Sequence, residues 1–206
     1  MTEIIKNRNG ISKTLTFLSK FETKKTIYVP MLYDGVIEVC LSKNNKVICK
    51  PADDKFKSLW EILRDEPTVL AKFIEIYPDS IEETSNSLSE VLKIQKNKLS
   101  IAYTLLSLTR RSREDTLMGG QLIAKGETFT PSYLQSLQEY KVPFHLSPHE
   151  PKDCFTFQDL TYLATDEVSK FSKVESSLFV TNNKQHIYCF DGAECSMIDN
   201  YYLIWR

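Results

Sequence analysis

The sequence predicts an α+β fold in which antiparallel β-hairpins from both chain ends form one sheet around a helical middle with one long helix. Three observations predict it. Runs of β-branched and aromatic residues surround Asn-Asn pairs near both chain ends, helical periodicity fills 53–112, and the C-terminal segment 197–205 is apolar and aromatic. A length of 206 residues with 42% hydrophobic residues favours a single domain over 1–206, with a helical sub-lobe over 53–112 as the alternative.

The N-terminal part begins with a helix and a strand. Apolar residues recur at helical spacing over 11–22, which predicts a short helix. The β-branched and aromatic run 26–33 predicts a strand. Pro30 places this strand at a sheet edge or at a break, because proline has no N–H to donate to a neighbouring strand.

Two hairpins are predicted around the Asn-Asn pairs, because asparagine tolerates the positive φ of a tight turn. The first hairpin covers 36–50 and would place Cys40 opposite Cys49 on one face of the sheet. The second covers 177–190, and the last strand covers 197–205.

From Asp53 the apolar period becomes helical. Asp53 is suited to cap the first helix, and Pro67 to begin the second. A helix after residue 153 is also expected. The predicted helices lie at 53–66, 67–77, 80–112, 131–140 and 153–163.

The composition excludes several classes of protein. The formal net charge is −1, so no acidic or basic field indicates a partner. Only 6 glycines occur, and the one glycine-rich segment, 119–126, lacks the spacing of a phosphate-binding loop or a dinucleotide fingerprint. We therefore expect no cofactor.

The compartment follows from the termini, the apolar runs and the cysteines. The N-terminus has no apolar core typical of a signal peptide, and the uncharged run 99–109 is too short to span a bilayer, which needs about 20 residues. The 5 cysteines form no Cys-x-x-Cys pair. We expect a cytoplasmic protein, or one delivered into a host cell without a conventional signal peptide.

A thiol hydrolase or transferase is one functional hypothesis. Cys154 stands where a helix is expected to begin, and a helix N-terminus lowers the pKa of a thiol. His186 follows as the base, and Asp199 (or Asp191) as the group that orients it. This Cys, His, Asp order is that of papain-like folds.

An arginine cluster supports a hypothesis of nucleic-acid binding. Arg110, Arg111 and Arg113 are three of the six arginines in the chain, and arginine suits bidentate phosphate contacts. The acidic pair at 114–115 and the favourable effect of cations at a helix C-terminus make a structural role the preferred interpretation.

A metal site is left unassigned. His145, His149 and Cys154 could be gathered by a loop, and Cys40 with Cys49 could chelate across the first hairpin. Solvated histidines and core cysteines explain the same residues.

The leading functional hypothesis is a non-enzymatic protein-interaction module, a regulatory, host-targeting or inhibitory factor from an AT-rich bacterium or virus. The absence of a cofactor loop and of a dense catalytic cluster favours it, and the aromatic residues provide anchors for a protein partner. The partner is another protein or a second copy of the chain, with nucleic acid less favoured.

Overall fold

The computed structural model describes residues 4, 5, 8, 10–76, 97–111 and 129–206. The chain divides into two compact units. The helical unit comprises 1–8 and 53–142, and the sheet unit comprises 9–52 and 143–206. The longer segment of the helical unit runs from Asp53 to Val142, and the expectation of a single domain over 1–206 stays a prediction.

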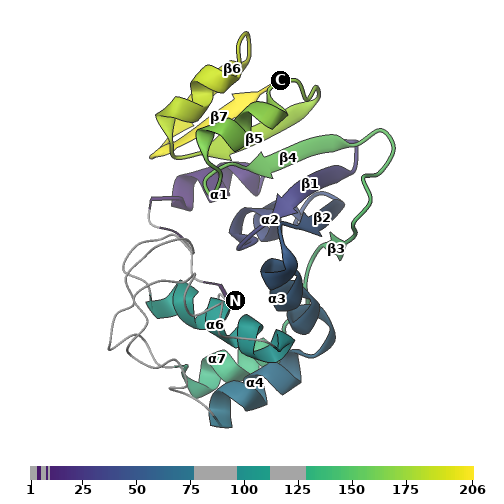
Figure 1. Cartoon of the computed structure of the whole chain (residues 1–206), viewed down its shortest axis with the longest axis vertical. Coiled ribbons are helices and arrows are strands. Elements are labelled where there is room, and N and C mark those ends of the chain that lie inside the picture. Colours follow the sequence, from purple (N-terminus) through teal and green to yellow (C-terminus); the bar gives the residue numbers. More distant parts are fainter. Residues whose placement is uncertain (1–3, 6–7, 9, 77–96, 112–128) are drawn as a thin grey trace. The chain divides into compact units, whose positions relative to one another are not determined.

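The sheet unit contains helices and a seven-stranded mixed sheet of order β3-β2-β1-β4-β5-β7-β6 (Figure 1). The first five strands in this order are parallel, and β7 is antiparallel to both of its neighbours. The strands are β1 (Ile27–Leu32), β2 (Val47–Pro51), β3 (His145–Leu146), β4 (Phe155–Asp159), β5 (Ser177–Thr181), β6 (Glu194–Ile198) and β7 (Tyr201–Trp205).

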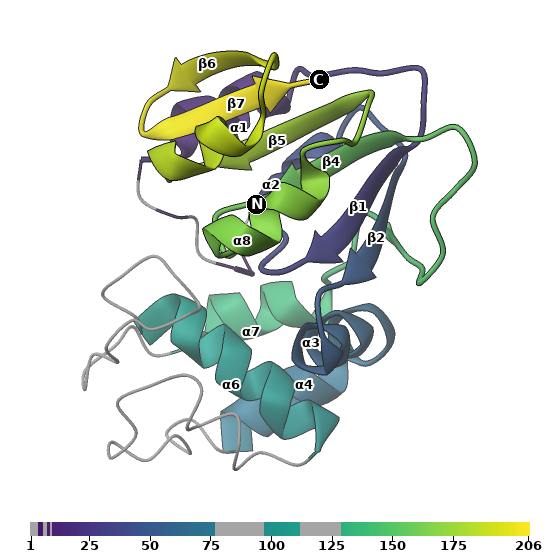
Figure 2. The same cartoon turned by 45° about the horizontal axis from the view of Figure 1, so that its top comes forward.

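The general α+β prediction is therefore confirmed, but its antiparallel arrangement is wrong for most of the sheet. Both parts of the chain that flank the helical unit do contribute to one sheet. Figure 2 shows β2, β1, β4 and β5 side by side, with β7 beyond β5. β5 is buried at every residue, and strands covered on both faces typically have such continuous runs rather than alternation.

The first predicted hairpin is a strand–helix–strand unit instead. Residues Val36–Leu41 form helix α2, which connects β1 to the parallel strand β2. Asn45 caps no turn. Its side chain donates to the carbonyls of Phe21 and Leu41 and so fixes the loop after α2. Cys40 therefore lies on a helix and does not face Cys49.

The second predicted hairpin is also wrong. After β5 the chain forms a 3₁₀ helix, η2 (Lys184–Cys189). The Asn183 side chain accepts a hydrogen bond from the Gln185 N–H at 2.9 Å, which caps this helix rather than turning a hairpin. The helix expected over 153–163 is wrong as well, because Phe155–Asp159 is strand β4.

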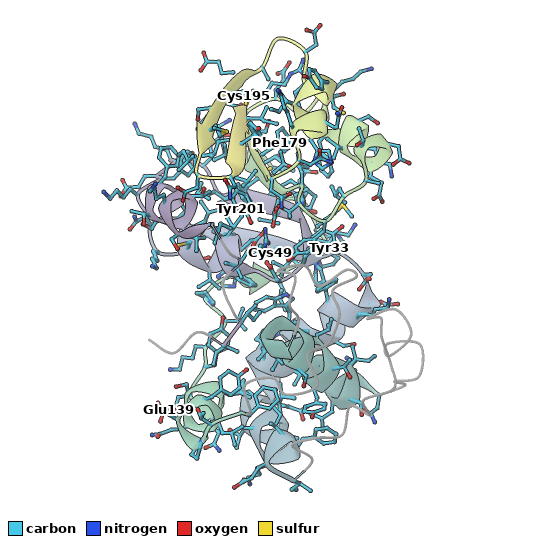
Figure 3. All side chains as sticks on the ribbon, turned by 90° about the vertical axis from the view of Figure 1, so that its left-hand side faces the viewer. Tyr33, Cys49, Glu139, Phe179, Cys195 and Tyr201 are labelled. Carbon is cyan, nitrogen blue, oxygen red and sulfur yellow. The ribbon has the colours of Figure 1, made fainter. Side chains whose placement is uncertain are left out.

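Other elements of the sheet unit agree with the sequence in part. Helix α1 (Ser12–Leu18) and β1 lie where they were predicted, whereas the single strand predicted over 197–205 is wrong, because β6 ends at Ile198 and β7 begins at Tyr201. Pro30, however, stands in a central strand, where it accompanies a register shift between β1 and β2. The core includes Phe179, which is fully buried and labelled in Figure 3. Two short helical elements connect β4 to β5: α8 (Thr165–Val168) and η1 (Ser169–Phe171).

Polar side chains cap two helices in the described part of the helical unit, and the cap at Asp53 was predicted. Asp53 accepts hydrogen bonds from two N–H groups of the first turn of α3, and Thr130 accepts one at the start of α7. The helices are α3 (Asp54–Asp65), α4 (Pro67–Ile76), α6 (Lys98–Arg111) and α7 (Pro131–Gln138).

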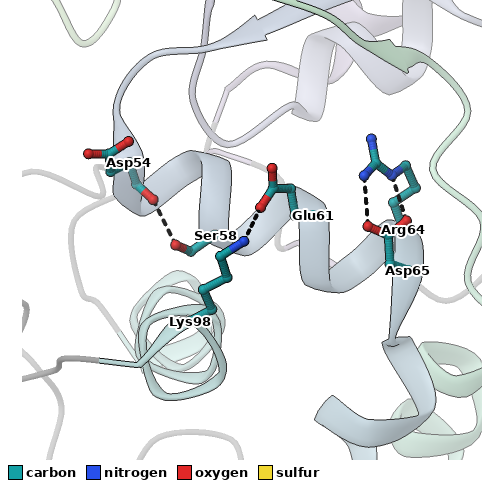
Figure 4. A network of polar contacts seen from close by, with 6 residues as sticks. All are labelled: Asp54, Ser58, Glu61, Arg64, Asp65 and Lys98. Atoms are coloured by element: carbon teal, nitrogen blue, oxygen red, sulfur yellow. Dashed lines mark hydrogen bonds and ion pairs between the residues drawn. The ribbon is translucent and has the colours of Figure 1, made fainter.

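Ion pairs and buried aromatic residues join these helices. Lys98 on α6 donates to Glu61 on α3 at 2.5 Å (Figure 4), and Trp60 is fully buried. The helix predicted over 80–112 is described only from Lys98 onward, and the segment 119–126 lies outside the described residues. Among the described helices, none combines the length and the apolar character that a bilayer crossing requires.

Candidate functional site

The strand order of the sheet unit places a candidate site at the carboxyl ends of β1 and β4. Within the sheet, β2 lies on one side of β1, and β4 and then β5 lie on its other side. In open parallel sheets, ligands bind outside the carboxyl ends of the strands where the order reverses in this way. We call the residues that follow or end these two strands the carboxyl-edge site: Tyr33, Asp34, Glu38, Asp159 and Tyr162.

Pro30 and Gln158 separate the two strands at this edge. Register pairs between β1 and β4 occur only at Ile27–Phe155 and Tyr28–Thr156. Beyond them the fully buried Gln158 amide lies between the strands, accepting from the Met31 N–H and donating to the Met31 carbonyl, each at 2.9 Å. Its Nε2 also donates to the Asp159 carbonyl at 2.9 Å. A side chain thus replaces the backbone ladder where proline interrupts it.

Asp34 is held in place by both strands. Its Oδ1 accepts from the N–H of Val36, the first residue of α2, at 3.1 Å. Its Oδ2 accepts from the Tyr162 hydroxyl, which follows β4, at 2.6 Å. Gly35 has a φ of 73°, which a residue with a side chain rarely adopts, and so lets the chain pass from strand to helix.

Aromatic rings lie beside these carboxylates. The rings of Tyr33 (labelled in Figure 3) and Tyr162 pack against each other at an angle of 42°, with centroids 5.0 Å apart. Asp159 accepts from the Thr161 N–H at 3.0 Å, which fixes the turn that leads to Tyr162. Both tyrosines are at most 9% exposed, so the site is an ordered part of the sheet unit.

The site has an anionic character. Asp34, Glu38 and Asp159 are 3%, 1% and 1% exposed. Burial, together with the Glu38 carboxylate, holds the pKa of the Cys49 thiol well above its ordinary value. Buried carboxylates require donors or cations around them, and Asp34 accepts hydrogen bonds from the Val36 N–H and the Tyr162 hydroxyl.

The predicted catalytic residues lie elsewhere in the sheet unit. Cys154 precedes β4 at the amino edge of the sheet, not a helix, and its Sγ contacts Glu150 Oε1 at 3.5 Å. Burial and Glu150 raise the pKa of this thiol, which disfavours the thiolate. The environment expected to activate Cys154 is therefore absent from its described surroundings.

His186 lies at the opposite edge. Its Nδ1 is 2.8 Å from the hydroxyl of Thr181, the last residue of β5, and its Nε2 is 3.2 Å from the Asn183 amide. Because β4 and β5 are parallel, a five-residue strand separates Cys154 from His186. At about 3.3 Å per residue this is on the order of 15 Å.

Asp199 belongs to a third location. It lies in the turn between β6 and β7 with a φ of 55°, and its carboxylate forms an ion pair with Lys13 at 3.0 Å. The alternative, Asp191, is exposed. The structure thus brings none of the three predicted catalytic residues into contact.

The remaining candidates are placed only in part. Arg110 and Arg111 are the last residues of α6, and Arg113 lies outside the described residues, so nucleic-acid binding stays a prediction. His145 forms part of β3 and His149 is exposed. Within the described ranges, no three His, Cys, Asp or Glu side chains gather in a way that could hold a metal ion.

The sequence contained a signal for the carboxyl-edge site that was interpreted as a turn. Asp34-Gly35 stands between a strand pattern and an apolar run, as at a strand-to-helix turn of a parallel sheet. Asp159 and Tyr162 were assigned to a helix and so were missed. Comparison of the sequence with protein-family models gives no match, and comparison with curated proteins gives none either.

Proposed function

We propose that the sheet unit binds a nucleoside-like small molecule with a positively charged group at the carboxyl-edge site, with S-adenosylmethionine as the defined probe. One observation carries the proposal. The two strands at which the order reverses each lead to a buried aspartate, because Asp34 follows β1 and Asp159 ends β4. Such a position in the fold is where open parallel sheets bind ligands.

The charges favour a cation over a phosphate. In dinucleotide-binding sheets a glycine-rich turn after β1 brings the pyrophosphate to the first N–H groups of the next helix. Here Asp34 accepts from the Val36 N–H at 3.1 Å, and Glu38 stands in the same first turn. Two carboxylates at this turn disfavour a pyrophosphate there, because like charges repel.

The aromatic pair and the strand order favour a nucleoside. The rings of Tyr33 and Tyr162 pack against each other, and the Tyr162 hydroxyl bonds to Asp34, so aromatic groups lie next to this carboxylate. Seven strands in this order, with the last antiparallel between the fifth and sixth, also form the sheet of many S-adenosylmethionine-dependent methyltransferases. This likeness concerns the fold, which alone does not define a function.

Isothermal titration calorimetry tests the proposal. We expect saturable binding of S-adenosylmethionine at one site, and none of ATP or NAD⁺ at the same concentrations. Asp34→Asn should weaken binding about tenfold or more, since hydrogen bonds to charged groups contribute roughly 1.5–3 kcal/mol. The matched control is Asp191→Asn, which changes an exposed aspartate of the same unit. No heat with S-adenosylmethionine, or equal binding of ATP, would overturn the proposal.

The protein-interaction hypothesis stays a prediction beside this proposal, and so do the thiol hydrolase and host delivery. A site for a small ligand is compatible with a protein partner, because the two would use different surfaces.

A further inference from the structure

Strand β6 forms an edge of the sheet that the described part of the chain leaves uncovered. It is the last strand in the order and pairs with β7 in an antiparallel ladder without a register shift (Figure 1). Four of its five residues are exposed, and the side chain of Met197 is 63% exposed. The backbone groups along such an edge are a template for pairing with a further strand.

The opposite edge of the same sheet is protected, whereas β6 is not. β3 has only two residues, and Pro143 and Pro148 stand on either side of it. Short edge strands, prolines, lysines and bulges are features that prevent pairing between sheet edges. β6 has five residues, contains no proline or lysine, and has Glu194 as its single charged residue. The sheet therefore leaves one edge open to pairing and closes the other.

The turn between β6 and β7 determines which backbone groups of β6 point outward. Ile198 pairs with Tyr201 across a two-residue loop, so these two residues exchange both hydrogen bonds. Because bonded and non-bonded pairs alternate, Ser196 also bonds to β7, whereas Cys195 and Met197 direct their N–H and C=O groups away from it. The side chains of these two residues are exposed and share one face of the sheet.

We propose that β6 pairs with β6 of a second copy of this chain, antiparallel and centred on Ser196. This register places Cys195 of each copy opposite Met197 of the other, so the outward groups of both copies find partners in four hydrogen bonds. Each exposed apolar side chain also meets another one. Glu194 lies opposite Ile198, so no like charges face each other across the pair.

Neighbouring registers satisfy fewer backbone groups. A pair centred on Cys195 would place Met197 opposite Ala193, whose N–H already donates to the Phe190 carbonyl at 3.2 Å. A pair centred on Met197 would place Cys195 opposite Asp199, which lies in the turn with a φ of 55°. Two strands of this length bury far less than the roughly 1,600 Å² of a stable complex, so the dimer forms at micromolar concentrations or above.

Sedimentation velocity from about 5 to about 500 μM tests the pairing. The weight-average mass of the wild type should rise towards that of two chains. Met197→Pro removes one outward N–H in each copy and leaves the bonds to β7 intact, so the dissociation constant of the dimer should rise at least about tenfold. Met197→Val is the matched control, because it keeps the N–H and should dimerise as the wild type does. Circular dichroism verifies that both variants fold.

Disulfide cross-linking with diamide tests the register. In a Cys195→Ser background, Ser196→Cys places one thiol of each copy in a directly opposed pair with Cα atoms about 4.5 Å apart, which a disulfide spans. Met197→Cys in the same background is the control, since its two thiols lie two residues apart along the strands and beyond the Cα limit of about 7 Å. We expect cross-linked dimer from Ser196→Cys and little from Met197→Cys. A wild type that stays monomeric, a Met197→Pro variant that dimerises equally tightly, or equal cross-linking of both cysteine variants overturns the proposal.

Discussion

Replacing Gln158 with leucine should destabilise the sheet unit far more than a typical substitution of glutamine. The wild-type amide forms three hydrogen bonds of 2.9 Å, with the N–H and carbonyl of Met31 and the carbonyl of Asp159. Leucine has a similar size and makes none of them. The Met31 N–H loses its acceptor at a place where proline already interrupts the ladder.

The size of the effect follows from the groups that lose a partner. A buried donor or acceptor left unsatisfied costs about 1–3 kcal/mol, and a carbonyl retains part of its solvation through its second lone pair. The free energy of unfolding should therefore fall by about 2–5 kcal/mol. Gln185→Leu is the control, because Gln185 is exposed and lies in the same unit, on η2.

Urea unfolding measures the change in the free energy of unfolding, with Trp205 as the probe. Incorporated 5-fluorotryptophan gives separate ¹⁹F resonances for Trp60 in the helical unit and Trp205 on β7, so the sheet unit is followed by itself. A loss below about 1 kcal/mol, or one equal to that of the Gln185→Leu control, would refute the argument that Gln158 replaces the missing ladder.

The remaining predictions concern two titrating groups. Burial lowers the pKa of His186, so the unfolded chain binds its proton more readily than the folded protein. The stability that neutral His186 provides is fully present above its unfolded pKa of about 6.5 and is lost as the pH falls below it. The urea concentration at the unfolding midpoint should therefore decrease as the pH is lowered from 7.5 to 5.5. This decrease should be smaller in His186→Asn. An identical pH profile in the variant contradicts the prediction. Cys154 should react with iodoacetamide no faster than Cys195 at pH 7.5, since burial raises the pKa of both thiols. Rapid modification of Cys154 alone, read by peptide mass spectrometry, would instead support the thiol hydrolase.

Local chemistry explains which elements could be predicted from the sequence. Asp53 and Thr130 cap helices through their own side chains, so the starts of α3 and α7 depend on neighbouring residues only. The apolar run at 201–205 forms β7 for a similar reason, because few other structures suit a terminal β-branched and aromatic segment.

Strand pairing could not be predicted in the same way, because it depends on residues far apart in the chain. A short apolar run such as 36–41 satisfies a strand or a buried helix equally well. Its helical form follows from Gly35, whose left-handed conformation turns the chain, and from the parallel strands on either side of it. Because 36–50 was interpreted as a hairpin, the parallel pairing of β1 and β2 was not predicted, and the site after β1 was missed.

The candidate site was missed for the same reason. Asp34 and Tyr162 are separated by 128 positions, and only the position of β4 beside β1 brings them together. Cys154 and His186 are close in the sequence, yet parallel strands place them at opposite edges. Proximity in the chain was therefore a poor guide to proximity in this sheet.

A ¹⁵N-resolved NMR titration with S-adenosylmethionine tests the central claim most directly, since it locates the ligand as well as detecting it. The account predicts that the largest amide shifts fall in 33–38 and 159–162, the segments that follow or end β1 and β4. Asp34→Asn should require about tenfold more ligand for the same shifts, and Asp191→Asn should leave the titration unchanged. An absence of shifts, or shifts confined to residues outside these two segments, would contradict the assignment of the site.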